Sequence, residues 1–162
     1  DSALGLTLSV PDHDRHMHSQ QYLKAKIVTA LGGRAAEEVI IERVFSGASS
    51  DLQKVEQIAT AMVTQFGMSD LGMKAFGNHS SNYLGGSYSE ATYGKETQQE
   101  IDAAVRAIVD ECYGEAKRIV TENKEKLIEA ARALCEVETI GAKELEQFFG
   151  PKAVRENKFS LQ

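Results

Sequence analysis

The chain has 162 residues, of which 42% are hydrophobic and 26% are charged, a composition typical of a single globular domain. Its net charge of −6 argues against nucleic acid as the main partner, since no basic run offsets the acidic balance. No apolar stretch is long enough to span a bilayer, so we expect that another part of the protein makes any membrane contact.

The first predicted element is a short β-strand over residues 3–11, where Leu4, Leu6, Leu8 and Val10 alternate with small or polar residues. A strand needs a neighbour, and the pattern predicts no second strand in the rest of the chain. We therefore expect the neighbouring strand to precede residue 1, which is the first indication that the chain is a fragment.

A histidine-rich segment follows at residues 12–18, where three histidines and two aspartates could bind zinc. No two of these histidines are four residues apart, so one helix face cannot present two imidazoles to a metal in that way. A solvated loop is therefore the favoured interpretation over a metal site.

A helix is predicted over residues 20–42, with Ser19 as its N-cap. Its inward stripe comprises Leu23, Ile27, Leu31, Arg34, Glu38 and Ile41. Arg34 and Glu38 are four residues apart and could form an ion pair on that stripe. Gly32 and Gly33 lie mid-helix, where each costs about 1 kcal/mol relative to alanine. Close approach of another helix is the usual reason for such a pair.

The next predicted helix covers residues 50–66 and ends at Gly67, a favourable residue for a helix C-terminus. Its apolar stripe comprises Leu52, Val55, Ile58, Ala59, Met62, Val63 and Phe66. Asp51 lies in register with this stripe, so we expect its carboxylate to point where water is scarce and to need a cation, a hydrogen-bond cluster or a metal. The alternative is a local role, in which Asp51 favours the positive end of the helix dipole or caps the helix.

A long loop is expected over residues 68–95, which are rich in Gly, Ser, Asn and Tyr and lack periodicity. Helices are then predicted over residues 96–122, 124–137 and 142–149, with a break near Asn123. The chain is thus expected to be mainly α with one short strand, with a domain over residues 1–150 and a disordered polar tail over residues 151–162. Cys112 and Cys135 lie inside helical patterns, so core thiols in a reducing compartment are favoured over a disulfide.

Four separated segments resemble one protein family in sequence and in order. They are ALGLTLSVPDHD from Ala3, ALGGRAAEEVI from Ala30, SGASSDLQKVEQIATAMVTQFGMSDLG from Ser46 and EIDAAVRAIVDECYGEAKRIVTENKEKL from Glu100. The family is that of the membrane-anchored, ATP-dependent zinc metalloproteases of the FtsH type, and the similarity is to their C-terminal peptidase domain. The resemblance covers nearly all of residues 3–149 and is more specific than a short motif.

The resemblance implies that the carboxylate of the SGASSD string, Asp51, is the third protein ligand of zinc. The GGRAAEE string supplies Gly32, Gly33, Arg34, Glu37 and Glu38. Here the family implies close packing near the metal-binding helix, with Glu37 or Glu38 as an acid that supports the metal ligands. From the residues alone, the alternative is that Glu37 is solvated and Glu38 pairs with Arg34.

The family's other two zinc ligands come from an H-E-x-x-H helix whose glutamate is the general base, and this sequence contains no such string. The four histidines, His13, His16, His18 and His79, cannot supply it. The phosphate loop of the ATPase module, which uses ATP and Mg²⁺, does not occur either. We therefore expect Zn²⁺ in the intact enzyme, and we expect the 162-residue chain by itself neither to bind catalytic zinc nor to cleave protein.

The expected function is that of a peptidase-domain fragment of a protease that hydrolyses peptide bonds of unfolded or membrane proteins. The expected partners are its ATPase module and the subunits of a homo- or hetero-hexamer, with residues 76–93 beside the substrate path. The parent protein is expected in a bacterial inner, mitochondrial inner or thylakoid membrane, with this domain on the soluble, reducing side. Two alternatives are a family member that lost H-E-x-x-H and acts as a structural or chaperone-like subunit, and an unrelated helical interaction module.

Overall fold

The computed structural model describes residues 18–73 and 94–151. The predicted strand, most of the histidine-rich segment, the loop over residues 76–93 and most of the polar tail lie outside the described residues. Within them the elements are α1 (Gln20–Ala36), the π-helical turn η1 (Glu37–Ile41), the 3₁₀ turn η2 (Ser46–Ala48), α2 (Ser49–Thr64), α3 (Lys95–Glu122), α4 (Lys124–Val137) and α5 (Ala142–Phe149). The prediction of a mainly α fold is confirmed.

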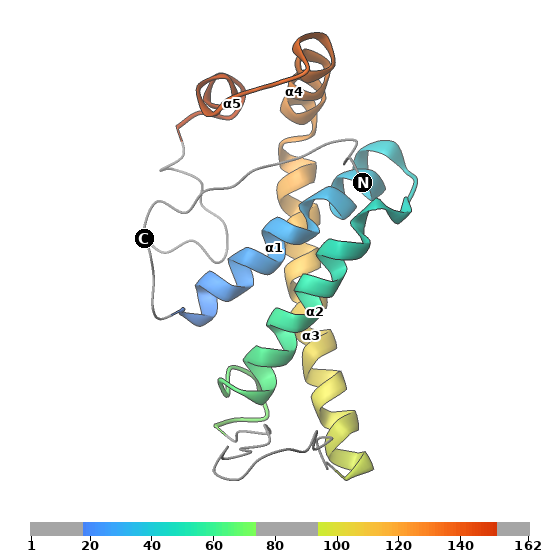
Figure 1. Cartoon of the computed structure of the whole chain (residues 1–162), viewed down its shortest axis with the longest axis vertical. Helices are drawn as coiled ribbons and strands as arrows, with labels where there is room; N and C mark the ends of the chain where they lie inside the picture. The colour runs from blue at the N-terminus through green and yellow to red at the C-terminus, as the bar shows by residue number, and fades with distance from the viewer. Residues whose placement is uncertain (1–17, 74–93, 152–162) are drawn as a thin grey trace, which may run out of the picture.

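The core lies where α1 and α2 pack against each other and against the long helix α3 (Figure 1). Each helix contributes a stripe of apolar residues at helical spacing, and these stripes meet in one cluster. Its largest fully buried side chains are Ile27 from α1, Val55, Met62 and Val63 from α2, and Cys112 from α3. Since α3 has 28 residues, it is about 42 Å long and extends beyond both shorter helices.

The helix ends follow local signals in the sequence. The Ser19 hydroxyl accepts a hydrogen bond from the backbone N–H of Tyr22 at 3.1 Å, which confirms the expected N-cap of α1. Beyond α2, Gly67 has a φ of +61°, and a Cβ there would lie 3.1 Å from the Cα of Met73. Glycine is therefore needed where the chain leaves α2, as the sequence predicts.

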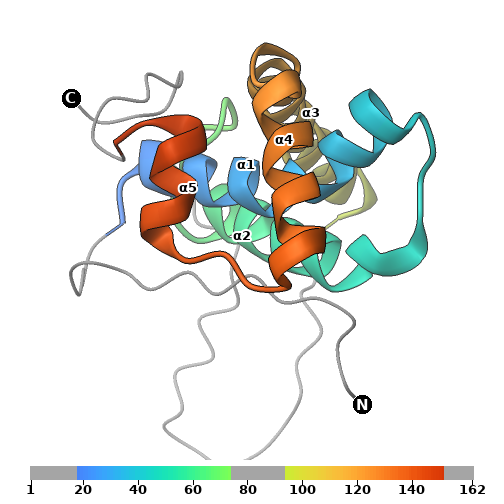
Figure 2. The same ribbon diagram turned by 90° about the horizontal axis from the view of Figure 1, so that it is seen from above.

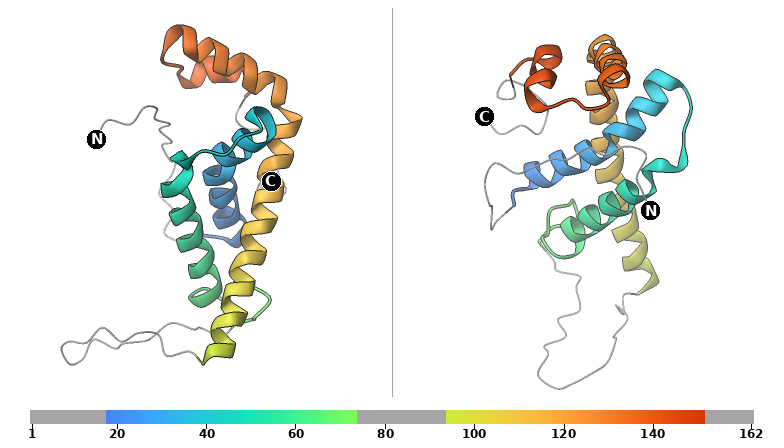
Figure 3. Two further views of the ribbon diagram at one scale, coloured as in Figure 1. Left: turned by 90° about the vertical axis from the view of Figure 1, so that its right-hand side faces the viewer. Right: turned by 45° about the horizontal axis from the view of Figure 1, so that its top comes forward.

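Helices α4 and α5 lie together beyond one end of α3, outside the three-helix core (Figure 2; Figure 3). The bounds of both helices agree with the prediction, but the exposure of their apolar residues does not. The spacing of Leu127, Ile128, Ala131 and Leu134 predicts that these residues face inward, yet Leu134 is 44% exposed. Ala130 is buried, whereas Val137 and Leu145 are 61% and 43% exposed. Cys112 is a core thiol as expected, but Cys135 on α4 is exposed, so that expectation was wrong for the second cysteine.

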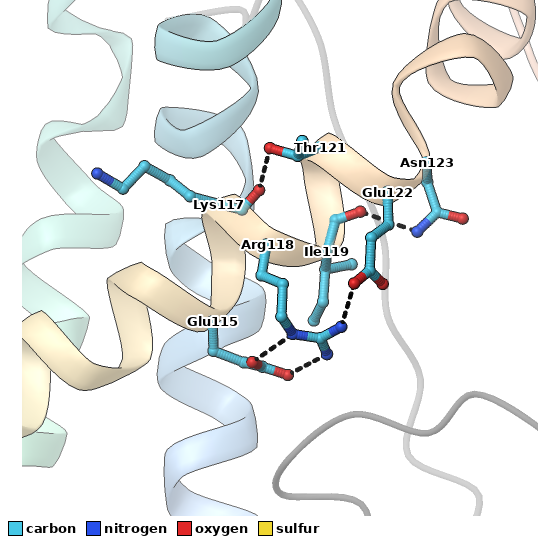
Figure 4. A network of polar contacts seen from close by, with 7 residues as sticks. All are labelled: Glu115, Lys117, Arg118, Ile119, Thr121, Glu122 and Asn123. Atoms are coloured by element: carbon cyan, nitrogen blue, oxygen red, sulfur yellow. Dashed lines mark hydrogen bonds and ion pairs between the residues drawn. The ribbon is translucent and has the colours of Figure 1, made fainter.

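A polar network at the end of α3 contains an acid that is buried (Figure 4). Arg118 donates from Nε and Nη2 to the two carboxylate oxygens of Glu115, at 2.8 and 2.6 Å, and from Nη1 to Glu122 at 2.7 Å. The Glu115 side chain is 5% exposed and that of Glu122 is 59% exposed. The bidentate geometry satisfies both oxygens of the buried acid with one cation.

Among the described residues, none of the helices combines the length and the apolar content that crossing a bilayer requires.

Candidate functional site

Asp51 lies in the first turn of α2, and its side chain is 45% exposed. The expectation that it points into the core was therefore wrong. Burial along α2 begins one turn later, at Val55, while Val44 and Phe45 of the preceding loop are at least half exposed. The apolar stripe of α2 thus extends past the edge of the core, and for the same reason Leu52 and Phe66 near the two ends of the helix are exposed.

The described contacts of the Asp51 carboxylate are weak ones. The Lys54 ammonium lies 3.6 Å away on the next turn and is 66% exposed. An exposed pair of this kind contributes about 0–1 kcal/mol, and a carboxylate in the first turn gains about 0.3–1 kcal/mol from the helix dipole. Asp51 can therefore fill the local role at the helix N-terminus, and its carboxylate also remains accessible from solvent to a metal ion.

The GGRAAEE string runs through the end of α1 into η1, where the helix widens to a π turn. The ion pair expected between Arg34 and Glu38 is not the one observed, because Arg34 lies 3.6 Å from Glu37 instead. A π turn holds one more residue than an α-helical turn, so side chains after Ala36 depart from the positions that a 3.6-residue period assigns. Glu38 consequently leaves the α1 stripe and contacts α3.

Solvent exposure was one of two interpretations of Glu37, the other being support of the metal ligands, and the structure argues against the first because the side chain is only 20% exposed. One oxygen of its carboxylate accepts a hydrogen bond from the backbone N–H of Phe45 at 3.2 Å. The Nη1 atom of Arg34 is buried and makes no hydrogen bond to a described residue, although it lies 3.6 Å from that carboxylate. Glu37 therefore connects the π turn to the loop that leads to α2.

The glycine pair faces open space in the described structure. A Cβ built at Gly32 or at Gly33 would meet nothing within 4 Å. No described helix makes the close approach that the pair was expected to serve, so the close packing implied by the resemblance remains a prediction for another element.

Glu38 is held by two side chains of α3. The Tyr113 hydroxyl donates to one oxygen of Glu38, and the Lys117 ammonium lies 3.6 Å from the other. The hydrogen bond from Tyr113, followed by the charge of Lys117, lowers the pKa of Glu38 below its ordinary value. Burial, together with the same hydrogen bond, raises the pKa of Tyr113 to about 12. The apolar spacing over residues 96–122 predicts that Tyr113 faces inward, but no role was predicted for it. The available signal was Lys117, one helical turn later.

The described residues do not by themselves make a zinc site. They contain no group of three His, Cys, Asp or Glu side chains that could hold a metal ion. A catalytic zinc usually has three protein ligands, among which an aspartate oxygen is a normal one. Asp51 suits that chemistry as a single accessible ligand, and the remaining ligands would have to come from outside the described residues.

Residues 1–148 match the model of peptidase family M41. The chain belongs to peptidase family M41. This confirms the resemblance drawn from the four sequence segments and excludes an unrelated helical module.

Curated relatives of this M41 chain agree with that assignment. It is 43% identical over 159 residues to the ATP-dependent zinc metalloprotease FtsH of Lancefieldella parvula, covering 98% of the chain and 24% of that protein. It is 39% identical over 160 residues to that of Bacillus subtilis, covering 96% of the chain and 25% of the relative. The protein of the same name from Cupriavidus metallidurans is 38% identical over 154 residues, covering 94% of the chain and 24% of the relative. The chain spans about a quarter of the length of these relatives.

Proposed function

We propose that this M41 chain is the peptidase domain of an ATP-dependent zinc metalloprotease that hydrolyses peptide bonds of unfolded or membrane proteins. The observation that carries the proposal is the family match, which extends over residues 1–148. Relatives 38–43% identical over almost the whole chain bear that name, which supports the same chemistry here. The inactive, structural alternative has no observation in its favour.

Asp51 is the proposed zinc ligand of this chain. Its position in the first turn of α2 places the carboxylate at an accessible edge, where its cationic neighbour is a mostly exposed lysine. The bound zinc would supply Lewis acidity and an activated water. The chain's own contribution is to hold one oxygen ligand at a fixed point on a rigid helix.

The proposed partners are those that the family resemblance implies. An ATPase module that uses ATP and Mg²⁺ would deliver unfolded substrates, and subunits of a homo- or hetero-hexamer would surround the site. Membrane attachment would come from a part of the protein outside the described helices. A bacterial inner, a mitochondrial inner and a thylakoid membrane all fit this proposal, with the peptidase domain on the soluble, reducing side.

A chimera tests the role of Asp51 directly. Residues 1–162 would replace the matching segment of the Bacillus subtilis relative, which aligns with this chain over 160 residues. We expect the chimera to retain zinc and to degrade unfolded casein in the presence of ATP, and we expect Asp51→Asn to abolish both. The matched control is Asp110→Asn, which removes the same charge from an exposed position on α3.

Each outcome of this test has a meaning. Zinc retention and cleavage at normal rates in the Asp51→Asn chimera would refute the ligand assignment. A folded chimera that binds no zinc before any substitution would show that residues 1–162 cannot complete the zinc site of the relative, which would also refute the ligand assignment. A separate incubation of the 162-residue chain with Zn²⁺ and casein should give no cleavage, and chelator-sensitive cleavage would contradict the predicted dependence on a second segment.

A further inference from the structure

Two neighbouring acids in η1 face two different parts of the molecule. Glu38 contacts α3, where the Tyr113 hydroxyl binds one carboxylate oxygen and the Lys117 ammonium lies near the other. The Lys117 ammonium also lies 4.7 Å from the centre of the Tyr113 ring, so the three side chains form one cluster. Both oxygens of Glu38 thus have their partners on a single long helix, while the side chain itself is 45% exposed.

Glu37 carries the connection onward to the loop before α2. Its carboxylate accepts from the N–H of Phe45, which is the N-cap residue of η2. The turn η2 runs directly into α2, whose first turn contains Asp51. Two sets of polar contacts, joined by the backbone between Glu37 and Glu38, therefore lead from α3 through η1 to the segment before α2.

Polar contacts matter here because apolar burial does not hold this loop. Ile41, Val44 and Phe45 are all at least half exposed, and Glu42 adopts a left-handed conformation with φ of 57°. A non-glycine residue in that region is uncommon and needs support from its surroundings. Helix α4 also contacts η1, because the Lys124 ammonium donates to the Val39 carbonyl oxygen, but this hydrogen bond is long at 3.4 Å.

We propose that Tyr113 and Lys117 are positioning residues for the peptidase site. By holding Glu38 they fix η1, and through Glu37 they fix the loop that orients the first turn of α2 and its carboxylate at Asp51. The effect on catalysis rests on the proposed zinc role of Asp51, whereas the effect on the loop does not. A ligand carboxylate displaced by even a fraction of an ångström binds zinc less tightly, because zinc–oxygen distances are confined to about 2.0–2.2 Å.

Hydrogen exchange in the 162-residue chain tests the mechanical part without any metal. Tyr113→Phe removes the hydroxyl that binds Glu38, and we expect the amide of Phe45 to exchange about tenfold faster, the size of one hydrogen bond to a charged group. The amide of Ala59 in the core of α2 should not change. Tyr22→Phe is the matched control, since Tyr22 also has a lysine above its ring but lies 16 residues before Glu38, about 24 Å along the helix. Unchanged exchange at Phe45 would overturn the proposal.

The catalytic part is measured in the chimera described above. Tyr113→Phe should weaken zinc retention about tenfold and lower kcat with KM unchanged. Lys117→Met should act in the same direction but by no more than about fivefold, because its ion pair with Glu38 is partly exposed. Lys117→Arg should retain most of the wild-type zinc affinity. A purely structural role predicts instead a lower unfolding midpoint with normal zinc affinity in the folded fraction, and that result would overturn the inference.

The Asp51→Asn chimera separates this inference from the proposed function. If Asp51→Asn loses zinc and the α3 variants do not, the positioning role fails and the ligand assignment stands. If Asp51→Asn keeps zinc, the ligand assignment fails, and the exchange rate of Phe45 still decides whether Tyr113 holds the loop.

Discussion

Replacing Ile27 by alanine should be among the most destabilising single changes in the described helices. Ile27 is fully buried on α1, where α1 meets α2 and α3. The substitution removes three carbon groups at about 0.8 kcal/mol each, or about 2.4 kcal/mol of transfer free energy. The cavity left behind raises the expected loss in the free energy of unfolding to about 3–4 kcal/mol, within the range for such changes.

The control is the same substitution at Ile41, which is 53% exposed. Roughly half of the transfer free energy is at stake there, so Ile41→Ala should cost about 1 kcal/mol. Both values come from urea denaturation of the 162-residue chain followed by circular dichroism, with the slope m compared between variants to confirm an unchanged transition. Equal losses at the two positions would show that Ile27 is not at the centre of the core, and the packing of α1 between α2 and α3 would be refuted.

Three further predictions concern glycine, charge and proton binding. Gly67→Ala should lower the free energy of unfolding by about 1–2 kcal/mol because the φ of Gly67 is +61°. Gly114→Ala should raise it by about 0.5–1 kcal/mol, because Gly114 is mid-helix and a new Cβ there meets nothing within 4 Å. Urea denaturation that shows both variants changing stability in the same direction would contradict this. Arg118→Ala should lower the free energy of unfolding by about 1–3 kcal/mol, because it removes the bidentate cation from buried Glu115. Glu122→Ala should lower it by less than about 1 kcal/mol. A larger loss in Glu122→Ala than in Arg118→Ala would be evidence against the burial of Glu115. Glu38→Gln should lower the pKa of Tyr113 from about 12 only part of the way to 10, since burial, the larger cause, remains; a tyrosine-ring carbon titration by NMR measures this, and a full return to 10 would show that burial is not the main cause.

The pH dependence of stability follows from the lowered pKa of Glu38. A carboxylate whose folded-state pKa lies below its ordinary value of 4.5 adds stability above that pH, and the contribution is lost as the pH falls through the folded-state pKa. Wild type should therefore lose more stability than Tyr113→Phe when the pH is lowered from about 5 to about 3. Parallel loss in the two proteins, measured by urea denaturation across that range, would show that the Tyr113 hydrogen bond does not stabilise the ionised acid.

The sequence predicted the helices well because each carries both periodicity and end signals. Ser19 indicated the start of α1, and Gly67 indicated the end of α2. The break at Asn123 indicated the start of α4, and Gly150 indicated the end of α5. The family was recognisable because long segments agree in order, which requires no knowledge of side-chain orientation.

Burial at the helix ends could not be predicted in the same way. A periodic stripe identifies the inward face of a helix but not how far along that face its neighbours extend. Asp51, Leu52 and Phe66 were therefore predicted to face the core, whereas Leu52 and Phe66 are exposed and the Asp51 side chain is 45% exposed. The π turn was missed because no residue in EEVII distinguishes it from an α-helical turn, and its extra residue redirected both Glu37 and Glu38. Tertiary contacts, which depend on residues distant in sequence, decide such cases.

The exposure of Asp51 is compatible with metal binding, even though burial was expected. Its two local partners, Lys54 and the helix dipole, together stabilise the carboxylate by at most about 2 kcal/mol. Complete protein zinc sites release on the order of 10 kcal/mol, so a zinc ion completed by other ligands would displace the lysine easily. Competition from these partners is therefore small compared with the free energy that a complete zinc site releases. The position of the Asp51 carboxylate therefore depends on the loop before α2. This loop has little buried apolar surface of its own and is held through Glu37, Glu38 and α3.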